Sequence, residues 1–209
     1  EDIKKTGYVV LASELKHAKK VNGHFELTLN SSDKIQCNFL INASGLHTED
    51  VANRIEEINL PKIKTVMYAK GHYYLYKKKN PFKHLIYPLP NSNGHGIHAG
   101  MDIENNLRFG PNAKWVDSIE YSFDENTLEE FCNSIKSYWV NFDPSCLSPD
   151  YTGIRSKIVA EGEGSQDFEI LDASDHGLEN LIHLQGIDSP GLTSSLSIAA
   201  EVISKLGIH

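Results

Sequence analysis

The sequence predicts an α+β fold in which strand–helix units lie at both ends of the chain and an antiparallel sheet lies between them. Near the C-terminus, an apolar run at Leu181–Leu184 is followed by a helical pattern over Thr193–Leu206. Near the N-terminus, the apolar run Phe39–Ile41 leads into a second helical stretch. From Lys64 to Gly110, strand-like runs are separated by clusters of Lys, Asn, Pro and Gly, which is typical of an antiparallel sheet.

In the N-terminal part, the first strand is expected at the short apolar run Tyr8–Ala12. Phe25–Asn30 alternates apolar and polar residues, and a turn cluster separates it from a second strand, Ile35–Ile41, so the two predict a hairpin. The consecutive apolar residues at the end of the second strand predict burial on both faces. A helix should follow from Thr48, the expected N-cap, to about Ile55.

Four strand-like runs make up the central block, namely T-V-M-Y-A, H-Y-Y-L-Y, H-L-I-Y-P-L and G-I-H-A-G-M. Thr127–Tyr138 then has apolar residues at helical spacing and two glutamates in its first turn, which predicts a helix. Pro144 and Pro149 should bracket a loop, and strands should follow at Ile154–Val159 and Phe168–Leu171.

The turn after Leu184 has features of a ligand-binding helix N-terminus. Asp188 or Ser189 offers an N-cap, and Pro190 suits the first helical position. Gly191 has no side chain to obstruct a close approach. Unpaired backbone N–H groups at such a terminus can hold an electron-rich ligand, although an ordinary strand–turn–helix has the same pattern.

Composition excludes several classes of protein. The formal net charge of −8 and the pI near 5.7 argue against a nucleic-acid partner, which requires a basic face. No apolar run approaches the length of a membrane span, and no secretory signal opens the sequence. Three irregularly spaced cysteines, Cys37, Cys132 and Cys146, predict neither a disulfide framework nor a zinc site, so a cytoplasmic location is expected.

Five segments occur in an order that matches a known enzyme family. They are I-N-A-S-G-L-H at Ile41–His47, A-K-G-H-Y-Y at Ala69–Tyr74, L-R-F-G-P-N-A-K-W at Leu107–Trp115, Y-T-G-I-R-S-K at Tyr151–Lys157 and L-I-H-L-Q-G-I-D-S-P-G-L-T at Leu181–Thr193. Together they resemble the D-amino-acid-oxidase-like FAD oxidoreductases, most of all the branch of L-2-hydroxyglutarate dehydrogenases and oxidases. That family begins with a strand, a G-x-G-x-x-G turn and a helix that hold the ADP half of FAD, and no such unit occurs here.

The resemblance implies a partial FAD-binding domain with an antiparallel-sheet substrate domain inserted into it. Residues 1–60 and 161–209 would belong to the FAD-binding domain, and residues 61–160 to the substrate domain. Two segments would contact FAD, namely Ala43, Ser44, Gly45 and Leu46, and then Gly186, Ile187, Asp188, Ser189, Pro190, Gly191, Leu192 and Thr193. The ADP half of FAD would need the missing N-terminal half, either as a partner chain or as a lost segment. Apolar surface left uncovered by that half predicts self-association or a waiting partner.

Three residues are candidates for the chemistry of a 2-hydroxy acid. Arg155 and Lys157 lie at i and i+2, so a strand would place both cations on one face, where a guanidinium can grip a carboxylate with two hydrogen bonds. A solvated strand face has the same pattern. His98 is the candidate base for the substrate hydroxyl, since a neutral imidazole accepts protons near physiological pH, although a structural histidine is the alternative.

A lysine and a pair of histidines are two further candidate features. Lys70 occurs in a family segment and is a candidate for contact with substrate or flavin, with an exposed lysine beside a turn as the alternative. His95 and His98 are three residues apart, which on a strand places them on opposite faces, so no metal site is expected.

The resemblance implies an FAD-dependent oxidoreductase that converts a small 2-hydroxy acid, such as L-2-hydroxyglutarate, to the 2-oxo acid. One alternative is a non-catalytic remnant or assembly subunit that needs a separate FAD-binding chain. Another is an amine or amino-acid oxidase of the same family. The expected location is cytoplasmic, or peripheral to a membrane if the electrons pass to a quinone.

Overall fold

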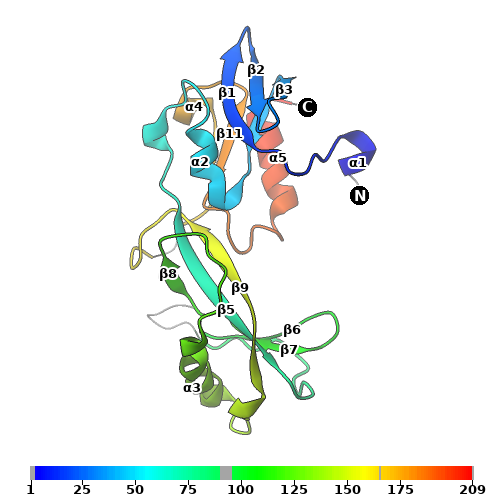
Figure 1. Cartoon of the computed structure of the whole chain (residues 1–209), viewed down its shortest axis with the longest axis vertical. Coiled ribbons are helices and arrows are strands. Elements are labelled where there is room, and N and C mark those ends of the chain that lie inside the picture. Colours follow the sequence, from blue (N-terminus) through cyan, green and yellow to red (C-terminus); the bar gives the residue numbers. More distant parts are fainter. Residues whose placement is uncertain (1–2, 90–95, 165, 209) are drawn as a thin grey trace. The chain divides into compact units, whose positions relative to one another are not determined.

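The computed structural model describes residues 3–89, 96–164 and 166–208. The chain forms two compact units (Figure 1). The first unit consists of the chain up to Val66 together with the segment from Glu163 onward, and the second unit is Met67–Gly162. Both contain helices and strands, which confirms the expected α+β class.

A three-stranded antiparallel sheet begins the first unit. Its strands are β1 (Leu15–Val21), β2 (His24–Leu29) and β3 (Lys34–Cys37), in that order. The predicted hairpin is confirmed as β2 and β3. The strand expected at Tyr8–Ala12 is wrong, because this run is largely exposed and pairs with none of the described strands. The strand that precedes the hairpin is instead β1. Its sequence is rich in lysine and lacks the apolar run by which a strand is usually recognised.

A second sheet in the first unit has the order β10 (Glu169–Leu171), β11 (Leu181–Gln185) and β4 (Leu40–Asn42). Strand β11 is antiparallel to β10 and parallel to β4. The chain therefore changes sheets after Cys37, and the single strand predicted at Ile35–Ile41 is wrong. Burial on both faces is also wrong, because β4 is at the edge of this sheet and the Ile41 side chain is 43% exposed.

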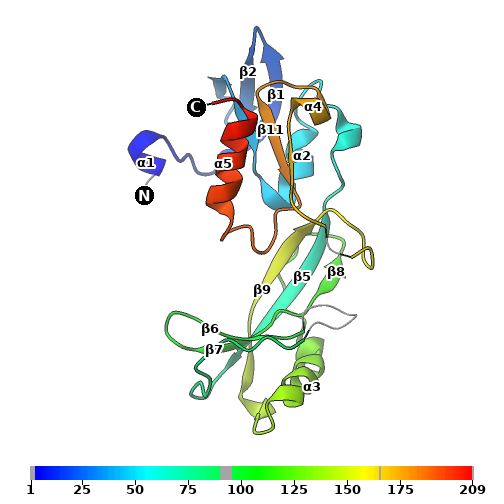
Figure 2. The same ribbon diagram turned by 180° about the vertical axis from the view of Figure 1, so that it is seen from behind.

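Helices cover both faces of the second sheet. Figures 1 and 2 show α2 (Thr48–Ala52) and α5 (Ser195–Lys205) on opposite sides of β11. Thr48 is not the N-cap, because a 3₁₀ turn at Gly45–His47 precedes it and its hydroxyl donates to the carbonyl of Leu184 instead. The shorter helical segments of this unit are α1 (Ile3–Thr6), a 3₁₀ turn at Leu60–Lys62 and α4 (Ala173–His176).

The second unit is built on a long antiparallel pair. Strand β5 (Met67–Tyr76) pairs along its whole length with β9 (Leu147–Lys157). Strands β6 (Ala99–Met101), β7 (Leu107–Phe109) and β8 (Lys114–Val116) complete the sheet, with β7 and β8 both paired to β5. The antiparallel block is confirmed, but its first two predicted runs are one strand, because Lys70 and Gly71 continue the ladder rather than turn.

Strand β9 begins earlier than predicted. Pro149 lies within β9, not at the end of a loop. A proline lacks the N–H that a central strand must donate, but among the described strands β9 pairs only with β5, and the register shifts where Pro149 faces Tyr74. An edge strand with a bulge is a position where a sheet tolerates proline.

Helix α3 (Leu128–Tyr138) confirms the predicted central helix. Its Phe131 and Ile135 are fully buried, and the Phe131 ring lies 4.6 Å from that of Tyr74 on β5. Two 3₁₀ turns, at Glu125–Thr127 and Pro144–Cys146, lie on either side of it along the chain. The helix covers one face of the sheet, and the side chains of Tyr73 and Tyr151 lie on the other face.

Candidate cofactor and substrate sites

The two predicted flavin-contacting segments come together in the first unit. The parallel register pairs Leu181 with Leu40 and His183 with Asn42, so β4 and β11 end at the same edge of the sheet. Ala43–Leu46 follows β4 and Gly186–Thr193 follows β11. Ligands of parallel α/β sheets bind outside the carboxyl ends of the strands, which is where both segments lie.

The second segment is a series of turns rather than a helix N-terminus. Helix α5 begins at Ser195, so neither Asp188 nor Ser189 is its N-cap and Pro190 is not its first residue. The Gly191 N–H donates to the Asp188 carbonyl at 2.5 Å, which closes a tight turn before the helix. The start predicted from small polar residues was wrong, since those residues stabilise turns as well as caps.

Both segments have room for a ligand. Gly45 has φ of +60° and nothing within 4 Å of the position that a Cβ would take. Ser189, Pro190, Leu192 and Thr193 are exposed, as are Ala43 and Ser44. Gly191 differs, because a Cβ there would lie 2.6 Å from the Asp188 carbonyl oxygen, so the tight turn itself requires glycine. The two segments thus expose backbone and mostly small side chains beyond the ends of β4 and β11.

Sequence reasoning missed two buried polar residues beneath these segments. Asn42 is 3% exposed and His183 is fully buried. Burial lowers the pKa of His183 to about 4, so the imidazole is neutral at physiological pH. The only signal in the sequence was a polar residue at the end of one apolar run, Asn42, and within the other, His183, which does not reveal that the two residues meet.

Arg155 and Lys157 lie on one face of the sheet in the second unit. Both are on β9, two residues apart, so alternation directs them to the same side. On that side Tyr73 stacks on Tyr151, with ring centroids 4.5 Å apart. We call this the Arg155 face, defined by Tyr73, Tyr151, Arg155 and Lys157.

The guanidinium of Arg155 differs from those of the other two arginines. Arg54 pairs with Glu14 at 2.7 Å. Arg108 pairs with both Asp102 and Asp150. Arg155 is half-buried, and within the described ranges no carboxylate forms an ion pair with it. A half-buried guanidinium without a carboxylate partner is suited to binding an anion.

A pair of glycines separates the tyrosine stack from Arg155. Gly71 and Gly153 face each other in the ladder between Tyr73–Tyr151 and the Arg155 pair. A Cβ at Gly153 would meet nothing within 4 Å, whereas one at Gly71 would lie 2.7 Å from Pro111. The space above Gly153 on β9 is therefore open, and it lies between the stacked tyrosines and Arg155 along the strand.

His98 connects to this face through two tyrosines. Its ring lies 4.2 Å from that of Tyr87. Burial raises the pKa of Tyr73, the neighbouring Tyr151 and Tyr87 raise it further, and Arg155 lowers it. Arg155 and Tyr87 therefore lie close enough to Tyr73 to act on its pKa, and the ring of Tyr87 contacts that of His98. Two of the predicted residues, Arg155 and Lys157, lie on this face, and His98 is close to it through Tyr87.

Lys70 lies on the opposite face. It pairs with Ile154 in the ladder, so it alternates away from Arg155. Its side chain is buried, and its Nζ donates to Glu120 Oε2 at 3.2 Å. The expectation of an exposed lysine beside a turn is wrong, because Lys70 is in the interior of β5. The structure does not bring Lys70 together with the other candidates.

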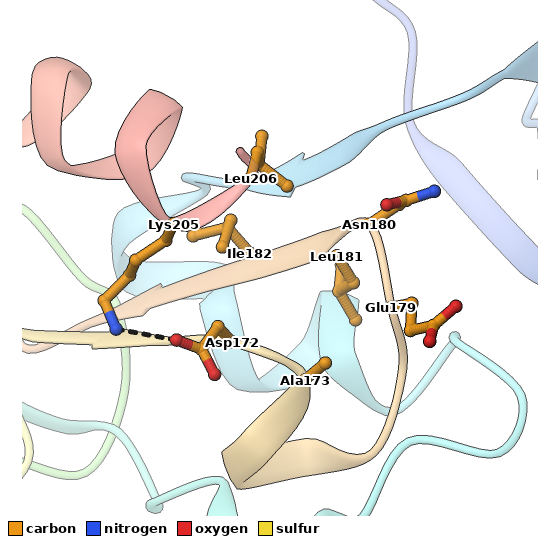
Figure 3. Close-up of a pocket in the computed structure, with 8 residues that line it drawn as sticks. All are labelled: Asp172, Ala173, Glu179, Asn180, Leu181, Ile182, Lys205 and Leu206. Carbon is orange, nitrogen blue, oxygen red and sulfur yellow. Dashed lines mark hydrogen bonds and ion pairs between the residues drawn. The ribbon is translucent and has the colours of Figure 1, made fainter. Parts of the chain in front are cut away.

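A separate pocket of about 290 Å³ lies in the first unit at the beginning of β11 (Figure 3). It is lined by Asp172, Ala173, Glu179, Asn180, Leu181, Ile182, Lys205 and Leu206. Lys205 points to Asp172 and pairs with it at 2.7 Å, which holds the pKa of that carboxyl well below its usual range. Because its lysine is neutralised in this way, the pocket has little attraction for an anionic substrate.

Among the described residues, no group of three or more His, Cys, Asp or Glu could hold a metal ion. His95, one of the two histidines weighed as metal ligands, lies outside the described residues. No helix in the part of the chain that the structure describes is both long and apolar enough to cross a membrane.

The chain is similar in sequence to known oxidoreductases. An L-2-hydroxyglutarate dehydrogenase, mitochondrial, of Arabidopsis thaliana is 32% identical over 80% of this chain and 37% of its own length. A glycerol 3-phosphate dehydrogenase of Caloramator mitchellensis is 26% identical over 95% of this chain and 39% of its own length. The chain thus spans well under half the length of these relatives.

Solved structures share the fold. An L-α-glycerophosphate oxidase from Mycoplasma pneumoniae with FAD bound superposes with a TM-score of 0.77 at 17% identity, over 94% of this chain and 50% of that one. A glycine oxidase from Geobacillus kaustophilus gives 0.71 at 13% identity, over 95% and 50%. The family model described as FAD dependent oxidoreductase matches residues 2–205. The chain therefore belongs to the DAO family of FAD-dependent oxidoreductases.

Proposed function

We propose that this chain is the C-terminal part of an FAD-dependent oxidoreductase that oxidises a small 2-hydroxy acid of the L-2-hydroxyglutarate type to the 2-oxo acid. The observation that carries the proposal is the half-buried guanidinium of Arg155 beside the open space above Gly153, on the same face as Lys157. A dianionic substrate approaching a chain of net charge −8 requires such a local cationic site.

The division of the chain follows from this proposal. The first unit would form part of the FAD-binding domain, and the second unit would be the substrate domain. The residues at the edge where β4 and β11 end suit a flavin ring, because Gly45 leaves open space and the neighbouring side chains are small and exposed. Ala43–Leu46 and Gly186–Thr193 would then hold the ring, and FAD when bound supplies the hydride acceptor.

The two cations of the Arg155 face and the nearby His98 each have a chemical task in this proposal. Arg155 would grip one carboxylate of the substrate with two parallel hydrogen bonds, and Lys157 would add a second positive charge. The carbon chain would lie in the open space above Gly153. His98 would accept the hydroxyl proton at a ring nitrogen, for which its neutral form is required.

The relatives also support a second substrate class. The Caloramator relative and the Mycoplasma structure are named for glycerol 3-phosphate, which is likewise a small dianion with a hydroxyl group. A phosphate would suit Arg155 and Lys157 as well as a carboxylate does. The favoured substrate stays L-2-hydroxyglutarate because the Arabidopsis relative is the more similar in sequence. The cytoplasmic location and the requirement for a partner half stay predictions.

The first test is a titration of the purified chain with FAD and, in parallel, with FMN, followed by flavin fluorescence. Because the proposed contacts are to the ring, the chain alone should bind both flavins with similar dissociation constants, within about threefold. Adding a polypeptide that supplies the dinucleotide-binding half should then strengthen the binding of FAD but not that of FMN.

The substrate is tested on the flavin-loaded protein. L-2-hydroxyglutarate should bleach the flavin absorption, and glycerol 3-phosphate and glycine should do so more slowly. Faster bleaching by glycerol 3-phosphate would assign the second substrate class, and by glycine the amine-oxidising alternative. Absence of flavin binding with and without the added half would leave the non-catalytic subunit as the better account.

A further inference from the structure

The turn that follows β4 is held by one buried side chain. Asn42 Oδ1 accepts hydrogen bonds from the Ser44 backbone N–H at 3.3 Å and from the Ser44 hydroxyl at 2.6 Å. Asn42 is 3% exposed, so its amide oxygen is shielded from water even though its partner Ser44 is exposed. The amide oxygen therefore fixes the turn immediately before Gly45, which has a positive φ.

The other end of the same amide binds β11 and the chain that begins α2. Asn42 Nδ2 lies 2.8 Å from the Thr48 carbonyl oxygen and 3.0 Å from His183 Nδ1. Its orientation is determined, because a flipped amide would place oxygen against the Thr48 carbonyl and nitrogen against the Ser44 N–H. His183 Nδ1 is consequently the acceptor.

This amide is located where both flavin-contacting segments begin. Asn42 and His183 are opposite each other in the last pair of the parallel β4–β11 ladder. Ala43 follows Asn42 directly, and Gly186 follows His183 by three residues. The hydrogen bond between Asn42 and His183 thus joins the end of β4, which leads to Ala43–Leu46, to β11, which leads to Gly186–Thr193.

We infer that Asn42 is a positioning residue, which acts through Ser44 and His183 to hold the two flavin-contacting segments at a fixed separation. The inference rests on the proposed function, since it assigns a purpose to the geometry of that site. Asn42 itself is buried beneath the segments and is not proposed to contact the flavin. Without it, binding would have to order the turn as well as hold the ring, which weakens affinity.

The test compares Asn42→Leu with a matched control, Thr48→Val. Leucine has a similar volume but no polar atom, so all four interactions of the Asn42 amide are lost. Thr48 is also fully buried, and valine removes its hydroxyl bond to the Leu184 carbonyl while keeping the backbone carbonyl that Asn42 binds. Both variants lose buried hydrogen bonds and should lower the melting temperature, but only one releases the turn.

Two readouts separate positioning from stability. The flavin dissociation constant should rise about tenfold or more in Asn42→Leu and less than about threefold in Thr48→Val. Hydrogen exchange of the Ser44 amide, measured without flavin, should accelerate in Asn42→Leu alone. Asn42→Asp keeps an oxygen for Ser44, so hydrogen exchange at Ser44 should stay slow, but its second oxygen lies against the Thr48 carbonyl and should make the variant less stable than the wild type. If Asn42→Leu does not fold, Ser44→Ala decides, because without flavin it should accelerate hydrogen exchange in the Ala43–Leu46 backbone, whereas Thr48→Val should not.

The outcomes distinguish this inference from the proposed function. Equal loss of affinity in Asn42→Leu and Thr48→Val, with unchanged exchange at Ser44, overturns the positioning role and leaves the proposed function intact. A wild-type chain that binds no flavin, with or without the dinucleotide-binding half, overturns both.

Discussion

The two-residue period of a β-strand places Arg155 and Lys157 together on one side of the sheet. The i and i+2 spacing with Lys157 predicted a shared face, and the alternation along β9 places both side chains on one side of the sheet. The period does not predict which partners each cation finds. Arg108 has two carboxylate partners while Arg155 has none among the described residues, and only the fold distinguishes them.

At this scale we predict that Arg155→Met weakens substrate binding strongly. Loss of a charge-assisted, two-pronged contact is worth about 1.5–3 kcal/mol, so the dissociation constant for L-2-hydroxyglutarate should rise roughly tenfold to a hundredfold. Arg155→Lys should give an intermediate loss, because an ammonium keeps the charge but not the fork. The measurement is calorimetric titration of the flavin-loaded protein.

The matched control for this prediction is Lys136→Met, which removes an exposed cation from α3. It lowers the net charge by the same amount but is on a helix that covers the other face of the sheet. Similar losses in Arg155→Met and Lys136→Met would mean that overall charge, rather than a local contact, governs binding.

At the scale of elements, the second unit depends on how α3 packs against β5. The helical period of Thr127–Tyr138 predicted this helix, and the structure buries Phe131 and Ile135 of that period against aromatic side chains. The sequence predicts two strands where the structure has β5, because Lys70 and Gly71 suggest a turn between them. The long pairing with β9 overrides that local preference, since it forms ladder hydrogen bonds across the position.

We predict that Phe131→Ala destabilises the second unit by about 3–5 kcal/mol, because it removes a fully buried ring from the cluster around Tyr74. Leu128→Ala is the control on the same helix, since Leu128 is 41% exposed. It should cost less than about 1 kcal/mol. Urea unfolding followed by tryptophan fluorescence reports the change, as Trp139 packs in the same cluster. Comparable costs for the two variants would contradict this packing account.

At the scale of the whole molecule, α5 has apolar residues on two sides. Val202 and its neighbours pack against β11, as expected of a helix that covers a sheet. Leu196 and Ile203 are seven residues apart on the outer side and are 84% and 46% exposed, and Leu192 just before the helix is 91% exposed. A helix that is apolar all round is normally buried, so this outer stripe lacks a cover in the isolated chain.

We predict that the isolated chain self-associates through this stripe. The double variant Leu192→Gln with Leu196→Gln should shift the molecular mass measured by light scattering toward the monomer, because it removes the exposed apolar area that drives association. Val140→Gln, which alters a single exposed apolar residue in the second unit, should have no such effect. A wild-type chain that stays monomeric across the concentration range would refute the prediction.

The sequence alone determined the α+β class, the antiparallel block, the central helix and the family, because hydrophobic period and ordered motifs are local properties of the chain. Only the tertiary structure decided that the chain changes sheets before β4, that Lys70 is buried, and that Asn42 meets His183 across 141 positions. Those facts depend on which strands pair and in which register. Register is set by the cooperative burial of distant side chains, which no local pattern records.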